Sequence, residues 1–413
     1  MPRIACNPTV FVGYTQTETR CQITEIMHGV ADPGFIDTKI AVLDKTPFYA
    51  ESGGQLADQG ELLNENNQVL AVVTDVQKTE NNIYLHHVQA KRQIISGEKV
   101  IAKVDLTRRE KLKANHSATH LLHAALREIL GDHVTQKGSL VAEEYLRFDF
   151  SHAKLLSREE TENIEDRANQ IIRENARAIT EIKSKDAAIR QGALSLFGEK
   201  YGDEVRVVAM GNDNFSLELC GGTHVGRTGD IGLFKIISCE TIASGIKRIE
   251  ALTGQNALTY LRNQILALSN DKKSLEEKYS KLQKENRAQQ QQVLSMEING
   301  IEGKKIGDIT LISKVFKDIG IKELHTAAIN RRNRSTASII ILFSTFGKTV
   351  NFIIAITKDI AGEKLNAAEL VAMANQIVGG KGGGKPDFAQ GGGKEASKIS
   401  EVIIKLEQYL KKM

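Results

Sequence analysis

The sequence contains no tryptophan, only four cysteines and only five prolines among its 413 residues. Four cysteines are too few for the disulfide framework of a small secreted domain, so we expect free thiols and a cytoplasmic location. Long apolar runs are also lacking. The longest, such as Ile339–Phe343 and Phe352–Ile356, are strand-length and far below the roughly 18 residues that span a bilayer. Because the first residues also lack the apolar core of a signal peptide, we expect neither a transmembrane helix nor secretion.

Neither sign of charge is in large excess, because the sequence has 55 Lys and Arg against 51 Asp and Glu, which gives a net charge of +4. This balance does not by itself indicate a nucleic-acid partner. The hydrophobic share of 41% and the charged share of 26% are typical of globular proteins and exclude disorder throughout. At about 100 to 200 residues per domain, the length predicts two to four domains. We therefore expect a multidomain α+β protein.

Residues 1–106 are expected to form a β-rich, barrel-like module. Short apolar runs such as Val69–Val73 and Val100–Val104 alternate there with turn signals. The turn Glu51–Gln55 contains two glycines, which can take positive φ and let the backbone approach a ligand closely. A plain hairpin turn explains the same residues, so the sequence leaves both interpretations open.

Residues 107–254 are expected to form an α+β core. Thr107–Glu110 has the pattern of a capping box, and the apolar periodicity after it continues to Leu130, before Gly131. A second capping box, Ser157–Glu160, predicts a helix that runs to about residue 178. The sheet, mostly antiparallel, is predicted from a hairpin over 138–150, strands near 205–210 and 214–219, and further strands to about residue 251.

Residues 255–299 are expected to form coiled-coil helices, because apolar residues recur there with a 4,3 spacing. An intramolecular helical hairpin would show the same seam, so a homodimer through this segment and the residues after it is one of two arrangements that the pattern allows. The polar seam residues Lys272, Asn286 and Gln289 would weaken the seam while favouring one register. The other seam positions are Leu261, Ile265, Leu268, Leu275, Tyr279, Leu282, Val293 and Met296.

Residues 300–413 are expected to form a small α/β domain with a hairpin around Gly347. The stretch Gly379–Gly393 holds eight glycines in fifteen residues, and Lys381, Lys385 and Lys394 add positive charge. Exposed backbone N–H groups beside lysines suit contact with phosphate. A flexible linker is the alternative, although linkers seldom carry an aromatic anchor such as Phe388.

Two residue pairs have the spacing of metal ligands. His116 and His120 lie four apart on the first predicted helix, so their imidazoles project from one face. Such pairs are more often surface or satisfied core residues, but Cys220 and His224 add a thiol and an imidazole around two glycines. A thiolate with imidazoles favours Zn²⁺ over Mg²⁺ or Ca²⁺.

Two neighbouring residues bear on the chemistry of this candidate site. His123 faces the same side of the helix, and we interpret it as a packing or supporting residue. The residue after His116 is Ser117, whereas helical zinc proteases use His-Glu-x-x-His with the Glu as general base. A protease is therefore disfavoured.

Several motifs follow one another along the chain, namely Asn115–Leu126, Val134–Ser139, Leu146–His152, Leu196–Lys200 and Cys220–His224. Together they resemble the editing domain of bacterial alanyl-tRNA synthetases and their free-standing relatives. The similarity covers nearly the whole chain, and Gly379–Gly393 resembles the glycine-rich motif of the family's C-terminal DHHA1 domain. The family's synthetases carry an aminoacylation half upstream, so we expect either a C-terminal piece of a synthetase or a free-standing editing protein. The motif Thr46–Gln55 favours the first.

The resemblance implies an aminoacyl-tRNA deacylase that removes serine or glycine from tRNA(Ala). A synthetic pocket cannot strongly reject an isostere that only adds a hydroxyl, so a second site must remove the product. In the family's motifs, Thr119 and Gln136 are implicated in telling serine from alanine. A Thr119 hydroxyl that bonds the backbone carbonyl four residues back is the alternative.

The resemblance also implies Zn²⁺ held by His116, His120 and Cys220, with His224 as a fourth candidate ligand. If His224 binds directly, the coordination sphere is closed; if it does not, a position stays open for water or substrate. The zinc would lower the pKa of a bound water or polarise the ester. A non-catalytic tRNA-binding and dimerisation part with structural zinc is the second hypothesis.

RNA contacts are expected in two places. Arg147, with Arg108 and Arg109, could meet phosphates at the acceptor end, and the C-terminal domain would hold the tRNA body. Solvated surface charge is the alternative for each of these residues. The C-terminal candidates are Lys381, Lys385, Lys394, Arg331, Arg332 and Arg334.

Overall fold

The computed structural model describes residues 6–28, 38–195, 202–362 and 365–413. The motif Leu196–Lys200 lies outside these residues. The chain divides into two compact units, Met1–Ala267 and Leu268–Met413. In the described part of the chain, none of the helices combines the length and the apolar character needed to cross a membrane.

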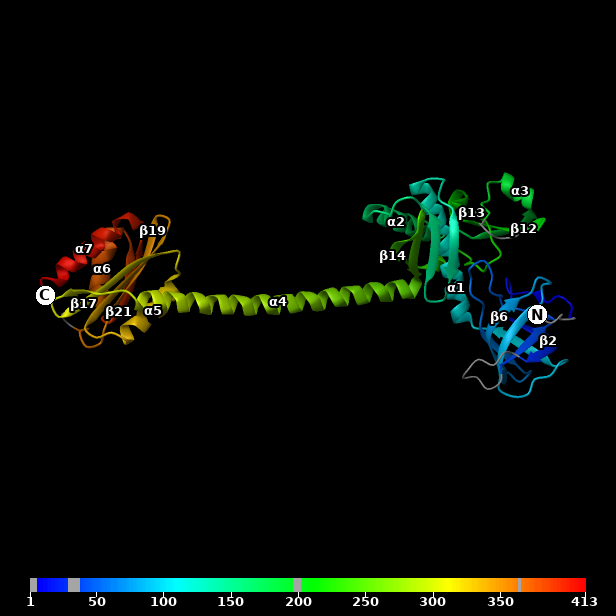
Figure 1. The fold of residues 1–413 in the computed structure, drawn as a ribbon, viewed down its shortest axis with the longest axis horizontal. Coiled ribbons are helices and arrows are strands. Elements are labelled where there is room, and N and C mark those ends of the chain that lie inside the picture. Colours follow the sequence, from blue (N-terminus) through cyan, green and yellow to red (C-terminus); the bar gives the residue numbers. More distant parts are fainter. Residues whose placement is uncertain (1–5, 29–37, 196–201, 363–364) are drawn as a thin grey trace. The chain divides into compact units, whose positions relative to one another are not determined.

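The N-terminal part of the first unit is a closed barrel, as the sequence predicts (Figure 1). Alternating strand residues such as Ile23, Leu62 and Val73 are fully buried inside it. The order of the strands is β2-β3-β7-β6-β5-β8, and the short strands β1 (Val10–Phe11) and β4 (Lys45–Thr46) pair in parallel beside it. The barrel strands are β2 (Glu18–His28), β3 (Thr38–Leu43), β5 (Gly60–Leu63), β6 (Val69–Lys78), β7 (Tyr84–Ala90) and β8 (Lys99–Val104).

The helix that carries the candidate metal ligands, α1 (Leu106–Leu130), starts two residues earlier than its sequence pattern predicts. Its N-cap is Asp105, whose carboxylate accepts from the backbone N–H of Arg108, so the capping box predicted at Thr107 is wrong. The helix ends where predicted, because Gly131 takes a φ of 111° and donates to the Arg127 carbonyl.

The second long helix, α2 (Arg158–Glu174), has the predicted capping box between Ser157 and Glu160. It is shorter than predicted, because Asn175 adopts a left-handed conformation and ends it. Both helices pack on a four-stranded sheet of order β14-β15-β10-β9, and a three-stranded sheet, β11-β12-β13, lies nearby with helix α3 (Lys185–Arg190). The strands are β9 (Gln136–Val141), β10 (Leu146–Ser151), β11 (Ile179–Ser184), β12 (Glu204–Met210), β13 (Ser216–Leu219), β14 (Phe234–Ala243) and β15 (Ile246–Thr253).

The predicted coiled-coil segment is a single continuous helix, α4 (Gly254–Asn299), which begins in the first unit and ends in the second. The intramolecular hairpin is therefore wrong. Along the middle of the helix the apolar seam residues are exposed, with Leu268, Leu275 and Leu282 each between 62% and 68% accessible. Its ends are buried, at Ala257 in the first turn and at Leu294 and Ile298, which pack in the second unit.

The second unit is a six-stranded sheet covered on both faces. Residues alternate between the two sides of β18, with Ile339 facing α6 and α7 and Ile340 facing α5 and the end of α4. Burial on both faces explains its continuous apolar sequence. The order is β16 (Lys304–Ile306), β17 (Ile309–Lys317), β18 (Ser338–Phe346), β19 (Thr349–Ile356), β21 (Phe388–Gly393) and β20 (Lys381–Lys385), and the helices are α5 (Ile321–Asn333), α6 (Ala367–Val378) and α7 (Ile399–Leu410).

The glycine-rich stretch is a β-hairpin formed by β20 and β21, not a flexible linker. Its glycines allow close backbone approach. A Cβ on Gly380 would lie 1.7 Å from the Gly392 carbonyl oxygen, and one on Gly391 would lie 2.5 Å from the Phe352 ring. Beside the hairpin is a cavity of about 930 Å³, which Lys381 and Lys394 line.

Candidate metal centre

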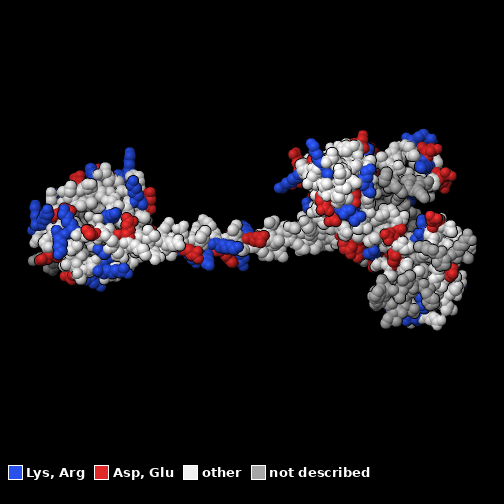
Figure 2. All heavy atoms as spheres, viewed as in Figure 1, with Lys and Arg blue, Asp and Glu red and all other residues white. Residues whose placement is uncertain are grey.

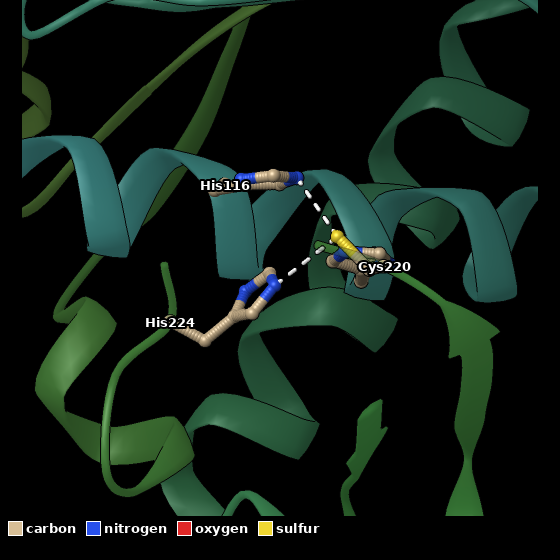
Figure 3. A group of neighbouring side chains, drawn as sticks. His116, Cys220 and His224 are labelled. Atoms are coloured by element: carbon tan, nitrogen blue, oxygen red, sulfur yellow. Dashed lines mark hydrogen bonds between the residues drawn. The ribbon is translucent and has the colours of Figure 1, made fainter. Parts of the chain in front are cut away.

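The two predicted ligand pairs come together in space. His116 and His120 project from one face of α1 with their rings stacked at 5.2 Å between centroids. Cys220 follows β13, and His224 lies four residues further along the same loop. One ligand atom from each of the four residues lies within 4.8 Å of all the others. Figure 3 shows three of them, His116, Cys220 and His224, with their side chains turned toward one another. Helix geometry and the glycine turn therefore converge on one point.

The distances suit one tetrahedral metal ion. Cys220 Sγ lies 3.4 Å from His116 Nε2 and 3.3 Å from His224 Nε2, the contacts dashed in Figure 3. In a tetrahedral zinc site, metal–sulfur bonds of about 2.3 Å and metal–nitrogen bonds of about 2.05 Å separate sulfur from nitrogen by about 3.6 Å. His120 supplies a further sign, because its Nε2 is buried and has no hydrogen-bond partner among the described residues. The residues therefore fit a metal, and their chemistry fits zinc.

The electrostatics of the centre favour the ligand forms of Cys220 and His224. Burial raises the pKa of the Cys220 thiol, but the neighbouring imidazoles of His116, His224 and His120 outweigh burial and hold this pKa well below its usual value. Burial lowers the pKa of His224 to about 3, although the Cys220 sulfur opposes this shift. A thiolate and a neutral imidazole are the forms that bind a metal.

Glu218 is a buried carboxylate that sequence reasoning missed. Its Oε2 accepts from His120 Nδ1 at 2.7 Å, and its Oε1 accepts from His123 Nδ1 at 2.9 Å. The carboxylate therefore orients His120 with Nε2 toward the cluster, as is common for metal-bound histidines. Burial lowers the pKa of His120, but Glu218 and the Cys220 sulfur outweigh burial and raise this pKa to about 10.

Three other residues belong to the predicted site. His123 stays outside the four-donor cluster and packs against Phe148, with ring centroids 5.3 Å apart. The buried Thr119 hydroxyl donates to the Asn115 carbonyl at 2.9 Å, which is the alternative noted for it above. Gln136 is the first residue of β9 and is half-buried.

The predicted RNA contacts divide into structural and available residues. Arg109 is fully buried and paired with Asp58, Arg108 pairs with Glu143, and Arg331 donates to the carbonyls of Asn299 and Ile301 at the end of α4. These three arginines bind partners within the protein. Their presence is therefore explained by a structural role and not by contact with phosphate. Arg332 likewise pairs with Asp387. Lys381, Lys385 and Lys394 are exposed, whereas Arg147 on β10 is half-buried with its Nε lacking a described partner.

Comparison with known proteins gives consistent matches along the chain. The family model "tRNA synthetases class II (A)" matches residues 4–108, "Threonyl and Alanyl tRNA synthetase second additional domain" matches 205–250, and "DHHA1 domain" matches 308–412. An alanine–tRNA ligase of Haemophilus influenzae strain PittGG is 40% identical, and one of Nitrosomonas europaea is 39% identical. Each alignment covers 98% of this chain. The chain belongs to the alanyl-tRNA synthetase family.

This member of the alanyl-tRNA synthetase family spans about half the length of the curated relatives it matches, because the alignments cover 48% of each ligase. Among solved structures, the C-Ala domain of the Aquifex aeolicus alanyl-tRNA synthetase is 33% identical. That match covers 27% of this chain and 99% of the other, with a TM-score of 0.26. The match to the second additional domain includes Cys220 and His224, and the DHHA1 match includes the glycine hairpin.

Proposed function

We propose that this chain is the editing part of an alanine–tRNA ligase and hydrolyses the ester of Ser-tRNA(Ala) and Gly-tRNA(Ala) at a zinc site. The observation that carries the proposal is the convergence of three imidazoles and one thiolate in a largely buried centre of a chain from this family. The physical need is discrimination, since a pocket for alanine cannot strongly reject a side chain that only adds a hydroxyl.

The chain's own residues have distinct tasks in this proposal. His116, His120, Cys220 and His224 hold the metal, and Glu218 keeps His120 in the tautomer whose Nε2 faces the centre. A bound Zn²⁺ supplies Lewis acidity to the ester or a lowered pKa to a coordinated water. The Thr119 hydroxyl donates its proton to the Asn115 carbonyl. Its oxygen keeps lone pairs that accept a hydrogen bond from a seryl hydroxyl. We assign Gln136 to the same recognition.

The C-terminal unit is proposed to bind the tRNA body. Lys381 and Lys394 border a cavity of about 930 Å³ lined by glycine backbone. Lys385 is the last residue of β20, the strand that begins with Lys381. Backbone N–H groups and ammonium groups together suit phosphate. On the face drawn in Figure 2 both signs of charge are present on this unit.

A homodimer through α4 is proposed as the assembly. Its seam residues Leu268, Leu275 and Leu282 are about two-thirds exposed along one stripe, and a second copy of the helix would bury them. Sedimentation equilibrium of the wild type and of the Leu275→Ser, Leu282→Ser double variant tests this. A dimer for the first and a monomer for the second is expected, whereas a monomeric wild type overturns it.

Deacylation by the purified chain tests the function. Zinc-loaded protein should release serine from Ser-tRNA(Ala) far faster than chelator-stripped protein, readdition of zinc should restore the rate, and Ala-tRNA(Ala) should be spared. The four-donor set is also the ligand number of a structural zinc site, which favours a second candidate, a non-catalytic tRNA-binding part. Zinc-loaded protein that folds and binds tRNA but leaves Ser-tRNA(Ala) intact would establish that candidate.

A further inference from the structure

Gln55 reaches the metal centre from a different module. It ends the Gly-Gly turn of the barrel part, 61 residues before His116, and is fully buried. Its side chain lies between His116 on α1 and Thr223 in the loop that carries Cys220 and His224. The barrel module therefore touches both ligand-bearing elements through one amide.

The hydrogen bonds fix which way this amide points. The backbone N–H of Thr223 can only donate, and it lies 2.9 Å from Gln55 Oε1. The Gln55 amide nitrogen donates to Thr223 Oγ1 at 2.9 Å, which agrees with this orientation. The same Oε1 lies 2.7 Å from His116 Nδ1. Since an amide oxygen cannot donate, Nδ1 must carry the proton, and the lone pair of His116 is on Nε2, facing Cys220.

The turn that carries Gln55 is held rigidly. Gly54 takes a φ of +81°, and a Cβ there would lie 2.7 Å from the Ser139 carbonyl oxygen. Its own carbonyl accepts from Val141 N–H at 2.7 Å, and Leu56 N–H donates back to Val141 at 3.1 Å. The two glycines thus let the turn lie close against strand β9. Backbone bonds on both sides of Gln55 limit where its amide can lie.

The loop side of the contact is equally tight. A Cβ on Gly222 would lie 2.1 Å from His116 Cε1, so the loop backbone presses on the imidazole that Gln55 orients. From the barrel, the Tyr14 hydroxyl donates to the Gly221 carbonyl at 2.6 Å. The loop is therefore fixed from the barrel at Gly221 and at Thr223, one residue before His224.

We propose that Gln55 is a positioning residue through which the barrel module sets the metal affinity of the centre, by fixing the tautomer of His116 and the distance between its helix and the ligand loop. This rests on the proposed metal site. Residues that orient a metal-bound histidine typically change metal affinity by 10- to 100-fold when removed.

Metal binding by Gln55 variants of the whole chain tests the proposal. Gln55→Met keeps the length but offers no acceptor, and we expect its dissociation constant for Co²⁺, and for Zn²⁺ in competition with a chromophoric chelator, to rise roughly 10- to 100-fold. Gln55→Glu keeps an acceptor at His116 Nδ1 and should stay within a few-fold of wild type. Gln59→Met is the matched control, because the side chain of Gln59 in the same module donates to the Thr74 carbonyl, and the variant should leave metal binding unchanged.

A second variant guards against misfolding of Gln55→Met. Thr223→Val removes the hydroxyl that holds the amide nitrogen while the Thr223 backbone N–H remains. It should weaken Co²⁺ binding several-fold and alter the thiolate-to-cobalt absorption band. Wild-type affinity in folded Gln55→Met, or in Thr223→Val if the first does not fold, would overturn the proposal. A wild type that binds neither metal would instead overturn the proposed function.

Discussion

His120 Nδ1 lies 2.7 Å from Glu218 Oε2, and the other oxygen of the same carboxylate accepts from His123 Nδ1 at 2.9 Å. Glu218 is 2% exposed, so this pair of bonds is shielded from water. The carboxylate satisfies two imidazole N–H groups at once. It thereby leaves the Nε2 of His120 as a free, buried donor atom in the metal cluster.

Glu218→Gln should weaken metal binding. An amide can accept from only one of the two imidazoles, and its NH₂ group then faces the N–H of the other. We expect the dissociation constant for Zn²⁺, measured by chelator competition, to rise roughly 10- to 100-fold. Glu204→Gln, at the exposed start of β12, is the control and should bind zinc like the wild type. Equal affinity in the two variants would show that Glu218 does not orient a ligand.

Arg109→Met should strongly destabilise the first unit. The Arg109 guanidinium is fully buried, pairs with Asp58, and donates to the carbonyls of Gly13 and Pro47. Removing one partner of a buried pair typically costs about 3–5 kcal/mol of unfolding free energy. Urea unfolding measures the loss. The matched substitution in the exposed pair of Arg92 and Glu98 should cost less than about 1 kcal/mol, and a similar loss in both would contradict the account.

His86 should make the barrel less stable as the pH falls. Burial lowers its pKa from 6.5 to about 4, while Ala41 and Thr46 bind the neutral ring. Below pH 6.5 the His86 side chain takes up a proton in the unfolded chain but stays neutral in the folded chain. The free energy of unfolding therefore falls with pH until the folded ring also becomes protonated near pH 4. The loss is on the order of 3 kcal/mol.

The measurement for His86 is unfolding free energy against pH in metal-free protein. His86→Gln should be less stable at pH 7 but should show a flatter profile between pH 6.5 and 4. Parallel profiles for the wild type and His86→Gln would rule out this assignment.

The three lysines of the glycine hairpin should carry part of the salt dependence of tRNA binding. Each phosphate contact that is lost reduces the slope of log K against log salt by roughly 0.7 to 0.9. A Lys381, Lys385, Lys394 triple alanine variant should therefore bind more weakly at low salt and with a flatter slope in a titration. A triple variant at Lys272, Lys278 and Lys281 of α4 matches its charge change and should leave the slope unaltered.

The part of the site that the sequence predicts is the part set by local spacing. His116 and His120 share a helix face, and Cys220 and His224 share a glycine turn, so each pair is visible within five residues. Glu218 and Gln55 act across 98 and 61 residues of chain. Only the packing of β13 and of the barrel turn against α1 brings them there, and no periodicity encodes that packing.

The fold shows the same limit. Alternation predicts the barrel strands because one face of each is buried, as at Ile23 and Val73. The seam around Leu275 is the same for a hairpin and for one long helix, so it could not distinguish them. The glycine hairpin has little strand propensity of its own. Its glycines are needed for close packing, because a Cβ at Gly380 would meet the backbone of Gly392 and a Cβ at Gly391 would meet the Phe352 ring.

Zinc K-edge X-ray absorption of the purified chain tests the central claim most directly, because it reports the metal and its donor atoms together. The account predicts one zinc per chain with one sulfur at about 2.3 Å and nitrogens at about 2.0–2.1 Å, and loss of the sulfur shell in Cys220→Ala. A chain that carries no zinc, or a zinc shell without sulfur that is identical in Cys220→Ala, would contradict it.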